Sequence, residues 1–454
     1  MKFKFKAILQ RDGWLENATV STDSIGNITS IEQTDDTTEA RGFALPGFFN
    51  AHCHSFQYAM AGLTETHPRG GGRDDFWSWR NTMYELALKL EPKEIEVIAT
   101  MLYAELLRNG YTHVAEFHYL HHDTYGQPYA NSAEIGIKLL NAAQRTGINI
   151  TLIPIFYQNG GFGKPAETVQ RRFLCKNVDE YAKLLDETIE ACKTFDCANA
   201  GVGVHSLRAV ETEQIKITAK ELHPELPFHI HVAEQIKEIQ DCLSFLNKRP
   251  VEWLLEELEL SQRFNLVHAT HINEREICGI TDMKANVVLC PTTEANLGDG
   301  IFPFQSFAEK DGCWSIGTDS NVSLYPMDEL RLLDYGQRLT TNRRDTFAIG
   351  QDGNSAQFAI DRCQRAGRSA MGLEFENYFE LGKPLNALVF SNDVPLLQNA
   401  TNNSLQNIML YALDSTNIEG VITRGKWRTK GSRHLLYDEI RAEFVEVMAK
   451  LRLH

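Results

Sequence analysis

Two histidines flank one cysteine in the stretch "NAHCHSFQYAM" (50–60), directly after the apolar run "ALPGFF" (44–49). In a strand, residues two apart point to the same side, so His52 and His54 can reach one point at the end of a strand, while Cys53 points away into the core. Imidazole nitrogens are common ligands of zinc. An isolated pair is also typical of hydrogen-bonded core histidines, so both interpretations remain open for this stretch alone.

Polar side chains also end four later apolar segments. They are His205 in "AGVGVHS", His231 and Glu234 in "PFHIHVAE", His268 in "FNLVHATH" and Asp319 in "CWSIGTDS". A barrel brings the ends of its strands together around one pit, which would place all of these side chains at a single site. The alternative is that each is a core residue whose hydrogen bonds are satisfied within its own surroundings. That alternative requires a polar residue to end every one of these segments by coincidence.

Three imidazoles and one carboxylate, from His52, His54, His231 and Asp319, form a ligand set suited to a single divalent ion. We expect Zn²⁺, with Fe²⁺ as the alternative. Such an ion lowers the pKa of a coordinated water towards neutrality and so supplies hydroxide. A bridging lysine would indicate two ions, but the fourth segment offers His205 and no lysine, so we predict one.

Further residues of this set could move protons. Glu234 follows His231 by three residues and can shuttle a proton to a nitrogen that is being expelled. His268 is placed to orient or deprotonate the water, and Asp319 can act both as a ligand and as a proton acceptor. The alternative for His268 is a histidine of the hydrophobic core without a catalytic role. Cys290, which precedes Pro291, is expected to be structural.

Eight short apolar segments, each followed by a stretch of helical periodicity, would position these residues. The segments are 44–52, 112–119, 149–157, 200–206, 227–234, 264–271, 286–294 and 313–320. Helices such as the one that opens at Pro92 and closes on Gly110 lie between them. This alternation predicts an α/β protein with a (β/α)8 barrel, although a doubly wound open sheet would produce the same pattern.

The two ends of the chain fall outside the alternation and read as short strands and turns. We predict that they pair into one small β-sandwich, made from residues 1–44 and 377–454, the latter with a terminal helix, around a barrel of residues 45–376. The glycine-rich stretch "HPRGGGRDD" (67–75) follows the first strand of the barrel, where such enzymes keep active-site loops.

Composition describes a folded chain of 454 residues that is 43% hydrophobic and 23% charged. The net charge of −15 argues against nucleic-acid or membrane partners, and an acidic substrate would need locally placed arginines. Nine scattered cysteines and the lack of a signal-like or membrane-spanning apolar run predict a cytoplasmic protein without disulfides.

The set of motifs resembles the amidohydrolase superfamily over nearly the whole chain, through "LPGFFNAHCHS", "HVAE", "HAT" and "TDS". The spacing of His231 and Glu234 is similar to that of its deaminase branch. Within that branch, "HSFQYAMAGL", "DDFWSWRNTMY", "VAEFHYLHHD", "HSLRAV" and "CPTTEANLGDGIF" resemble the formimidoylglutamate deiminases of histidine degradation.

This resemblance implies a hydrolase acting on the C–N bond of a linear amidine. Hydroxide supplied at the metal would attack the formimino carbon of N-formimino-L-glutamate, giving N-formyl-L-glutamate and ammonia. The substrate-binding residues that it implies are Gln57, Arg80, Tyr119, His205 and Arg208, with the arginines on the carboxylates. A homodimer is usual for the family.

Two other functions remain open on the sequence. A related enzyme could deaminate a heterocyclic amine such as a purine or pterin, for which aromatic stacking would matter more than two arginines. In a barrel that binds metal and ligand without catalysis, Glu234 and His268 would have no role. Whether Ser320 or Asn321 contacts a substrate is also open.

Overall fold

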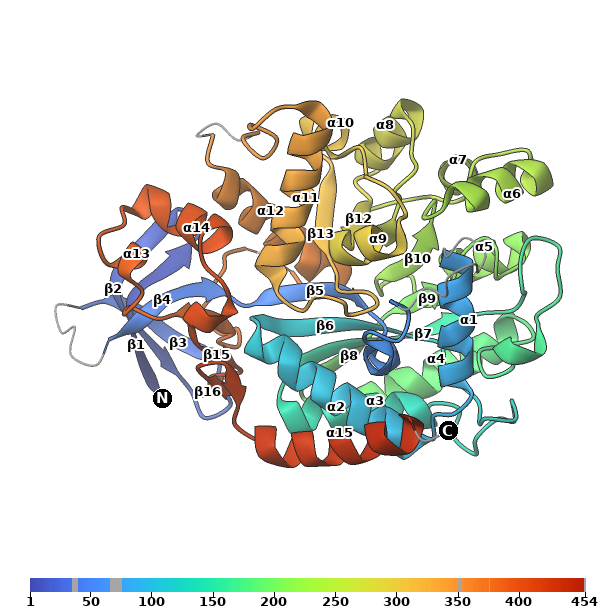
Figure 1. Cartoon of the computed structure of the whole chain (residues 1–454), viewed down its shortest axis with the longest axis horizontal. Coiled ribbons are helices and arrows are strands. Elements are labelled where there is room, and N and C mark those ends of the chain that lie inside the picture. Colours follow the sequence, from blue (N-terminus) through green and yellow to red (C-terminus); the bar gives the residue numbers. More distant parts are fainter. Residues whose placement is uncertain (35–39, 66–75, 350–352, 375, 453–454) are drawn as a thin grey trace.

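A computed structural model describes residues 1–34, 40–65, 76–349, 353–374 and 376–452. Within them the chain forms a barrel and a separate small β domain, which lie side by side in Figure 1. The glycine-rich stretch 67–75 lies outside the described residues, so its predicted role as an active-site loop stays a prediction.

Eight parallel strands form the barrel in the order in which they follow along the chain. They are β5 (Phe48–Cys53), β6 (Tyr111–His118), β7 (Asn149–Phe156), β9 (Val202–Val204), β10 (Phe228–Val232), β11 (Phe264–His268), β12 (Asn286–Leu289) and β13 (Cys313–Ile316), with the short β8 (Ala198–Ala200) also paired to β7. Each matches one of the eight segments that the sequence indicated.

The first and last strands close the barrel through the residues that follow β13. The backbone N–H of Asp319 donates to the carbonyl of His52 at 3.0 Å, and the N–H of His54 donates to the carbonyl of Asp319 at 3.1 Å. Gly317 permits this approach, because an added Cβ would lie 2.8 Å from both the Cβ and the carbonyl oxygen of His52. The closed barrel confirms the prediction and excludes the doubly wound open sheet.

Helices surround the strands (Figure 1). They are α1 (Phe76–Ala87), α2 (Pro92–Arg108), α3 (Glu134–Thr146), α4 (Val178–Cys192), α5 (Thr212–Glu221), α6 (Ile236–Leu246), α7 (Pro250–Glu257), α8 (Glu274–Asp282), α9 (Pro291–Leu297), α10 (Phe304–Glu309), α11 (Pro326–Thr341) and α12 (Ser355–Ala370). Local signals begin and end them: α2 starts with Pro92 in its first turn, and α3 ends on Gly147 at a φ of 85°. Short 3₁₀ helices, η1 (Ser55–Met60) and η2 (Thr168–Gln170), follow β5 and β7.

Both ends of the chain contribute to the small β domain, as predicted. Its seven-stranded sheet has the order β16 (Lys426–Trp427), β15 (Ile418–Thr423), β14 (Ala387–Phe390), β4 (Arg41–Pro46), β1 (Lys2–Gln10), β2 (Gly13–Thr22) and β3 (Ile28–Gln33). A two-stranded ribbon, β17 (Thr429–Lys430) with β18 (Arg433–His434), and the helices α13 (Pro395–Gln398), η3 (Ser415–Asn417) and α14 (Asn402–Tyr411) accompany it. The pairing of β4 with β14 joins the two ends of the chain.

The terminal helix α15 (Tyr437–Arg452) leaves the small domain and packs along the barrel beside α2 (Figure 1). Arg145 on α3 forms a salt bridge of 2.6 Å with Glu443 on this helix. The C-terminal helix therefore ties the small domain to the outer surface of the barrel.

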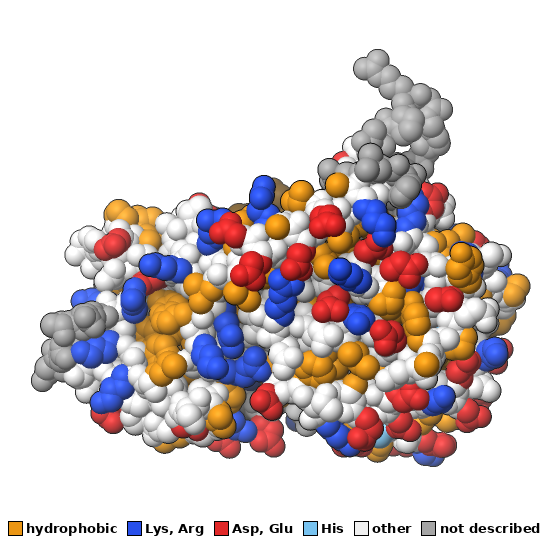
Figure 2. Space-filling model, turned by 90° about the horizontal axis from the view of Figure 1, so that it is seen from below, with side chains coloured by type: hydrophobic (Ala, Val, Ile, Leu, Met, Phe, Trp, Pro, Cys, Tyr) orange, Lys and Arg blue, Asp and Glu red, His pale blue; other side chains and the backbone are white. Residues whose placement is uncertain are grey.

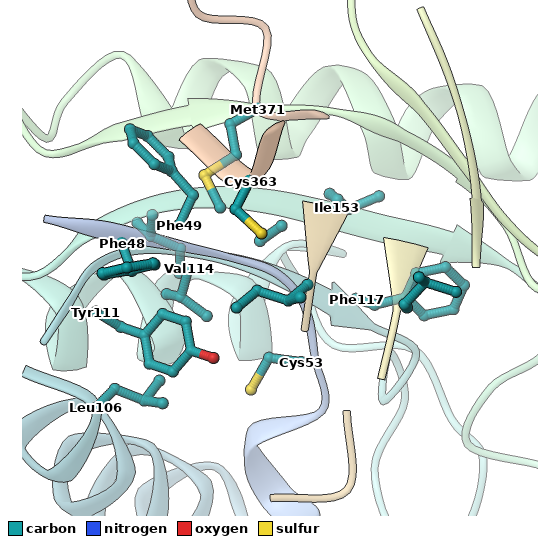
Figure 3. Close-up of a cluster of buried hydrophobic side chains, with 14 of the residues drawn as sticks. Phe48, Phe49, Cys53, Leu106, Tyr111, Val114, Phe117, Ile153, Cys363 and Met371 are labelled. Carbon is teal, nitrogen blue, oxygen red and sulfur yellow. The ribbon is translucent and has the colours of Figure 1, made fainter. Parts of the chain in front are cut away.

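The hydrophobic core runs from the barrel into the small domain. Figure 3 shows part of it, in which Cys53 lies among apolar side chains such as Phe48, Val114 and Ile153. Cys53 is fully buried, and its Sγ contacts Asn321 Oδ1 at 3.4 Å. This placement agrees with the packing role that the strand alternation predicted for it.

On the surface face in Figure 2, acidic and basic side chains are interspersed. Among the described residues, none of the helices combines the length and apolar composition that crossing a membrane requires. All nine cysteines are described and are free thiols.

Candidate active site

Four buried side chains meet at the carboxyl ends of three barrel strands. His52 and His54 come from β5, His231 from β10 and Asp319 from the turn after β13, and one ligand atom from each lies within 4.8 Å of those of the others. The parallel barrel brings these ends to one point, although up to 267 residues separate them in the chain (52 to 319). The structure thus assembles the whole set of metal ligands that the sequence predicted.

The spacing of these atoms fits one tetrahedral ion. Asp319 Oδ1 lies 3.3 Å from His52 Nε2 and 3.3 Å from His54 Nε2, and His52 Nε2 lies 3.0 Å from His231 Nε2. Ligands at 2.0 to 2.1 Å from a tetrahedral zinc ion would be separated by about 3.3 Å. Burial lowers the pKa of His52 to about 3, so its ring is neutral, which is the form that binds metal.

Hydrogen bonds around β5 hold this geometry. His54 Nδ1–H donates to the Phe117 carbonyl at 2.8 Å, which leaves the Nε2 lone pair facing the cluster. The side chain of Asn321 donates to the carbonyls of His54 and Asp319, each at 3.0 Å. Glu116 accepts the backbone N–H of Ser55 at 2.8 Å and so fixes the turn after His54.

The strand ends also carry unusual backbone conformations. Ala233, His268 and Asp319 have φ values of 53°, 69° and 46°, in the left-handed region that non-glycine residues seldom occupy. Such conformations persist only where the surrounding structure enforces them, and they cluster at functional sites. Here they turn Glu234, His268 and Asp319 towards one another.

Glu234 and His268 lie beside the ligand cluster. His268 Nε2 is 3.7 Å from Glu234 Oε1 and 3.8 Å from Asp319 Oδ2. Burial alone would lower the pKa of His268, but the surrounding carboxylates outweigh it and raise the pKa to about 10. Burial raises the pKa of Glu234 to about 7. One imidazole and two carboxylates this close to one another can carry out general acid and base chemistry.

Sequence reasoning missed one residue of this group, Glu294. Its Oε1 accepts a hydrogen bond from the backbone N–H of Cys290 at 2.9 Å and lies 3.2 Å from His268 Nδ1. It is buried on α9, after the seventh barrel strand, and the signal was the glutamate of "CPTTEANLG". Because Glu294 holds the Nδ1 side of the ring, it orients Nε2 of His268 towards Glu234 and Asp319.

Replacing Glu294 by alanine is expected to lower kcat by about 10- to 100-fold, because the His268 ring loses its partner. Glu294→Gln is expected to recover most of the activity, since an amide oxygen can still accept both hydrogen bonds. Steady-state rates with metal content checked for each variant provide the measurement. Wild-type kcat in the alanine variant would show that His268 does not depend on Glu294.

One cavity next to the cluster contains every substrate-binding residue that the resemblance implied: Gln57, Arg80, Tyr119, His205 and Arg208. Gln57 Nε2 donates to the Tyr119 hydroxyl at 2.9 Å, and its buried Oε1 has no hydrogen-bond partner among the described residues. The His205 ring packs against the His231 ring, with centroids 5.0 Å apart. The structure therefore brings all five together with the ligand cluster.

The two arginines occupy different parts of this cavity. Arg208 is buried, and its Nη2 lies 3.9 Å from Glu234 Oε2, at the end where Glu234 and His268 meet. Arg80 is half-buried on α1, and its guanidinium carbon lies 5.1 Å from the centroid of the Tyr84 ring. Two guanidinium groups in one cavity can bind a molecule with two carboxylates.

Ser320 and Asn321, which the sequence left open, are not among the residues that line this cavity. The Ser320 hydroxyl pairs with the Thr293 hydroxyl at 3.0 Å, and the Asn321 side chain braces the backbone of His54 and Asp319. Both residues support the turn that carries Asp319.

Known proteins resemble this chain over nearly its whole length. Residues 43–428 match the Amidohydrolase family. The chain is 38% identical over 453 residues to formimidoylglutamate deiminase from Pseudomonas aeruginosa, and the match covers 99% of each. The structure of an amidohydrolase from Brucella melitensis matches with a TM-score of 0.93 at 38% identity, covering 99% of both chains. The chain therefore belongs to the amidohydrolase family.

A more distant structure shares the fold. An adenosine deaminase from Xanthomonas campestris, described with bound zinc, matches with a TM-score of 0.78 at 18% identity, covering 100% of this chain and 98% of that one. The barrel with its accompanying β domain is thus common to enzymes with different names.

Proposed function

We propose that this enzyme hydrolyses N-formimino-L-glutamate to N-formyl-L-glutamate and ammonia. The observation that carries the proposal is the presence of Arg80 and Arg208 in the cavity that also holds Glu234, His268 and Asp319. An acyclic substrate with two carboxylates needs two cationic partners, whereas a neutral purine or pterin needs none. The full-length relationship to formimidoylglutamate deiminase supports the same substrate.

One divalent ion, zinc with iron as the alternative, is part of the proposal. His52, His54, His231 and Asp319 would hold it, because three nitrogens and one oxygen suit either metal. When bound, the ion lowers the pKa of a coordinated water and so makes it a nucleophile near neutral pH.

The side chains of the cavity divide the remaining work. Arg80 and Arg208 bind the carboxylates, and the Gln57 Oε1 is an available acceptor for an N–H of the formimino group. Asp319 accepts a proton from the attacking water, while His268, whose pKa the surrounding carboxylates raise to about 10, is protonated and can donate a hydrogen bond that orients this water. Both protons of the water finally reach the imino nitrogen through Asp319 and Glu234, so that the C–N bond breaks, ammonia leaves and the formyl C=O remains.

The proposal further includes a homodimer in the cytoplasm, with the small dicarboxylate as the binding partner in place of nucleic acid or membrane. The homodimer follows from the family resemblance, and the cytoplasmic location follows from the sequence composition. The dicarboxylate partner follows from the cavity, because two arginines line it although the chain as a whole is acidic.

Purified protein is expected to contain about one divalent ion per chain and to release ammonia from N-formimino-L-glutamate, but not from adenosine, at enzymatic rates. A chelator should remove both the ion and the activity, and His52→Ala should contain little metal. His229→Asn is the matched control, because His229 lies on the same strand as His231 but bonds to the Ala370 carbonyl at 2.7 Å. Metal-loaded protein that is inactive on this substrate would contradict the proposal.

A further inference from the structure

Two buried tyrosines line the substrate cavity together with both arginines. Tyr84 lies on α1 and Tyr157 directly follows β7, and their hydroxyl oxygens are 3.4 Å apart. Sequence reasoning singled out neither residue. Arg80 lies on α1 together with Tyr84, and its guanidinium stacks on the Tyr84 ring.

Gln170, the last residue of η2, determines which way these hydroxyls donate. Its Oε1 accepts the backbone N–H of Glu167 at 2.7 Å. Since a backbone N–H can only donate, the amide must present its Nε2 to the tyrosines. That nitrogen donates to the Tyr157 hydroxyl at 2.7 Å and to the Tyr84 hydroxyl at 3.0 Å. Gln170 is fully buried, so the arrangement is shielded from solvent.

The consequence concerns the hydroxyl protons. Each phenol oxygen already accepts an N–H from Gln170, so its own O–H must donate to another acceptor. One hydroxyl can donate to the other across 3.4 Å, but both cannot do so at once. At least one O–H therefore points away from Tyr84, Tyr157 and Gln170. Both tyrosines line the cavity, so an acceptor for this O–H can lie there. A carboxylate held by the arginines would be a suitable acceptor.

The charges around Tyr157 agree with this geometry. Burial raises the pKa of Tyr157, while the positive charges of Arg80 and Arg208 both act to lower it. Arg208 lies near Glu234 at the reacting end, whereas Arg80 stacks on Tyr84. With the carboxylate nearer the reacting carbon on Arg208, the other carboxylate would fall to Arg80 and the tyrosine on which it stacks.

We propose that Tyr84 and Tyr157, positioned by Gln170, donate hydrogen bonds to the side-chain carboxylate of the substrate and set the preference for an acidic over a neutral side chain. This inference rests on the proposed function. Tyr84 and Tyr157 are specificity-determining contacts, and Gln170 is a positioning residue that acts through them.

The test measures kcat/KM of the metal-loaded enzyme for N-formimino-L-glutamate and for N-formimino-L-glutamine, in which an amide replaces the side-chain carboxylate. Tyr84→Phe and Tyr157→Phe, singly and together, remove only the hydroxyls. For the double variant, kcat/KM on the glutamate substrate is expected to fall by about 10- to 100-fold, through KM, because hydrogen bonds to a charged group are lost. The loss on the glutamine substrate should be several-fold smaller.

Two further variants separate recognition from structure. Gln170→Met is expected to lower the preference for glutamate less than the double variant does, because the phenols keep their hydroxyls but lose their fixed direction. Tyr181→Phe is the matched control, since its buried hydroxyl donates to the Pro154 carbonyl at 3.0 Å and does not line the cavity. Its substrate preference should equal that of the wild type.

The outcomes are distinguishable. Equal losses on both substrates, or no loss in either single or double variants, would overturn this inference and leave the proposed function standing, provided that the wild type releases ammonia from N-formimino-L-glutamate. A metal-loaded wild type without that activity would overturn the proposed function. Thermal unfolding of each variant verifies that it is folded, and the single variants serve if the double variant is not.

Discussion

Glu234→Gln is expected to reduce ammonia release by about 10²- to 10⁴-fold, the usual contribution of a general acid or base. Glutamine keeps the shape of the side chain but cannot deliver a proton to the imino nitrogen. The ligand cluster does not include Glu234, so the variant should retain its metal. The loss should therefore be in kcat, with the metal content and the KM close to those of the wild type.

Glu238→Gln is the matched control for this variant. Glu238 is also buried, and its Oε2 accepts the backbone N–H of Glu234 at 3.1 Å, a bond that glutamine can still accept. It does not line the cavity, so its replacement should leave most of the activity. Ammonia release that is unchanged in Glu234→Gln would exclude the role of Glu234 as a proton shuttle.

Arg208→Ala is expected to raise KM for N-formimino-L-glutamate by about 100-fold, because hydrogen bonds from a guanidinium to a carboxylate are lost in a buried site. Arg80→Ala should act in the same direction but less strongly, since Arg80 is half-buried and water screens its charge. Initial rates over a range of substrate concentrations provide both constants.

A matched control for the arginines is Arg263→Ala. Arg263 is partly buried, but it donates to the carbonyls of Leu226 and Ala219 and does not line the cavity. Its loss should lower the stability without raising KM. If both Arg80→Ala and Arg208→Ala keep the wild-type KM, the dicarboxylate substrate loses its main support, and a neutral heterocyclic amine becomes the better candidate.

The barrel and the four side chains of the ligand cluster could be predicted because their signals are local. Strand periodicity places His52 and His54 on one side of β5, and alternating strands and helices predict where β10 and β13 end. Once the strands are parallel and closed, His231 and Asp319 can only meet that pair at the carboxyl ends. Arg80 and Arg208 could be predicted for the same reason, because each lies in a short, distinctive motif of the family.

Hydrogen-bond partners could not be predicted in this way, because they depend on distances between side chains far apart in the chain. Glu294 reaches His268 across 26 residues, and Gln170 reaches Tyr84 across 86. No periodicity relates such pairs, and small rotations of the elements that carry them would break a bond of about 3 Å. The amino-acid pattern thus defines the ligands and the barrel that presents them, whereas packing in three dimensions determines how His268 is oriented and which way the tyrosine hydroxyls point.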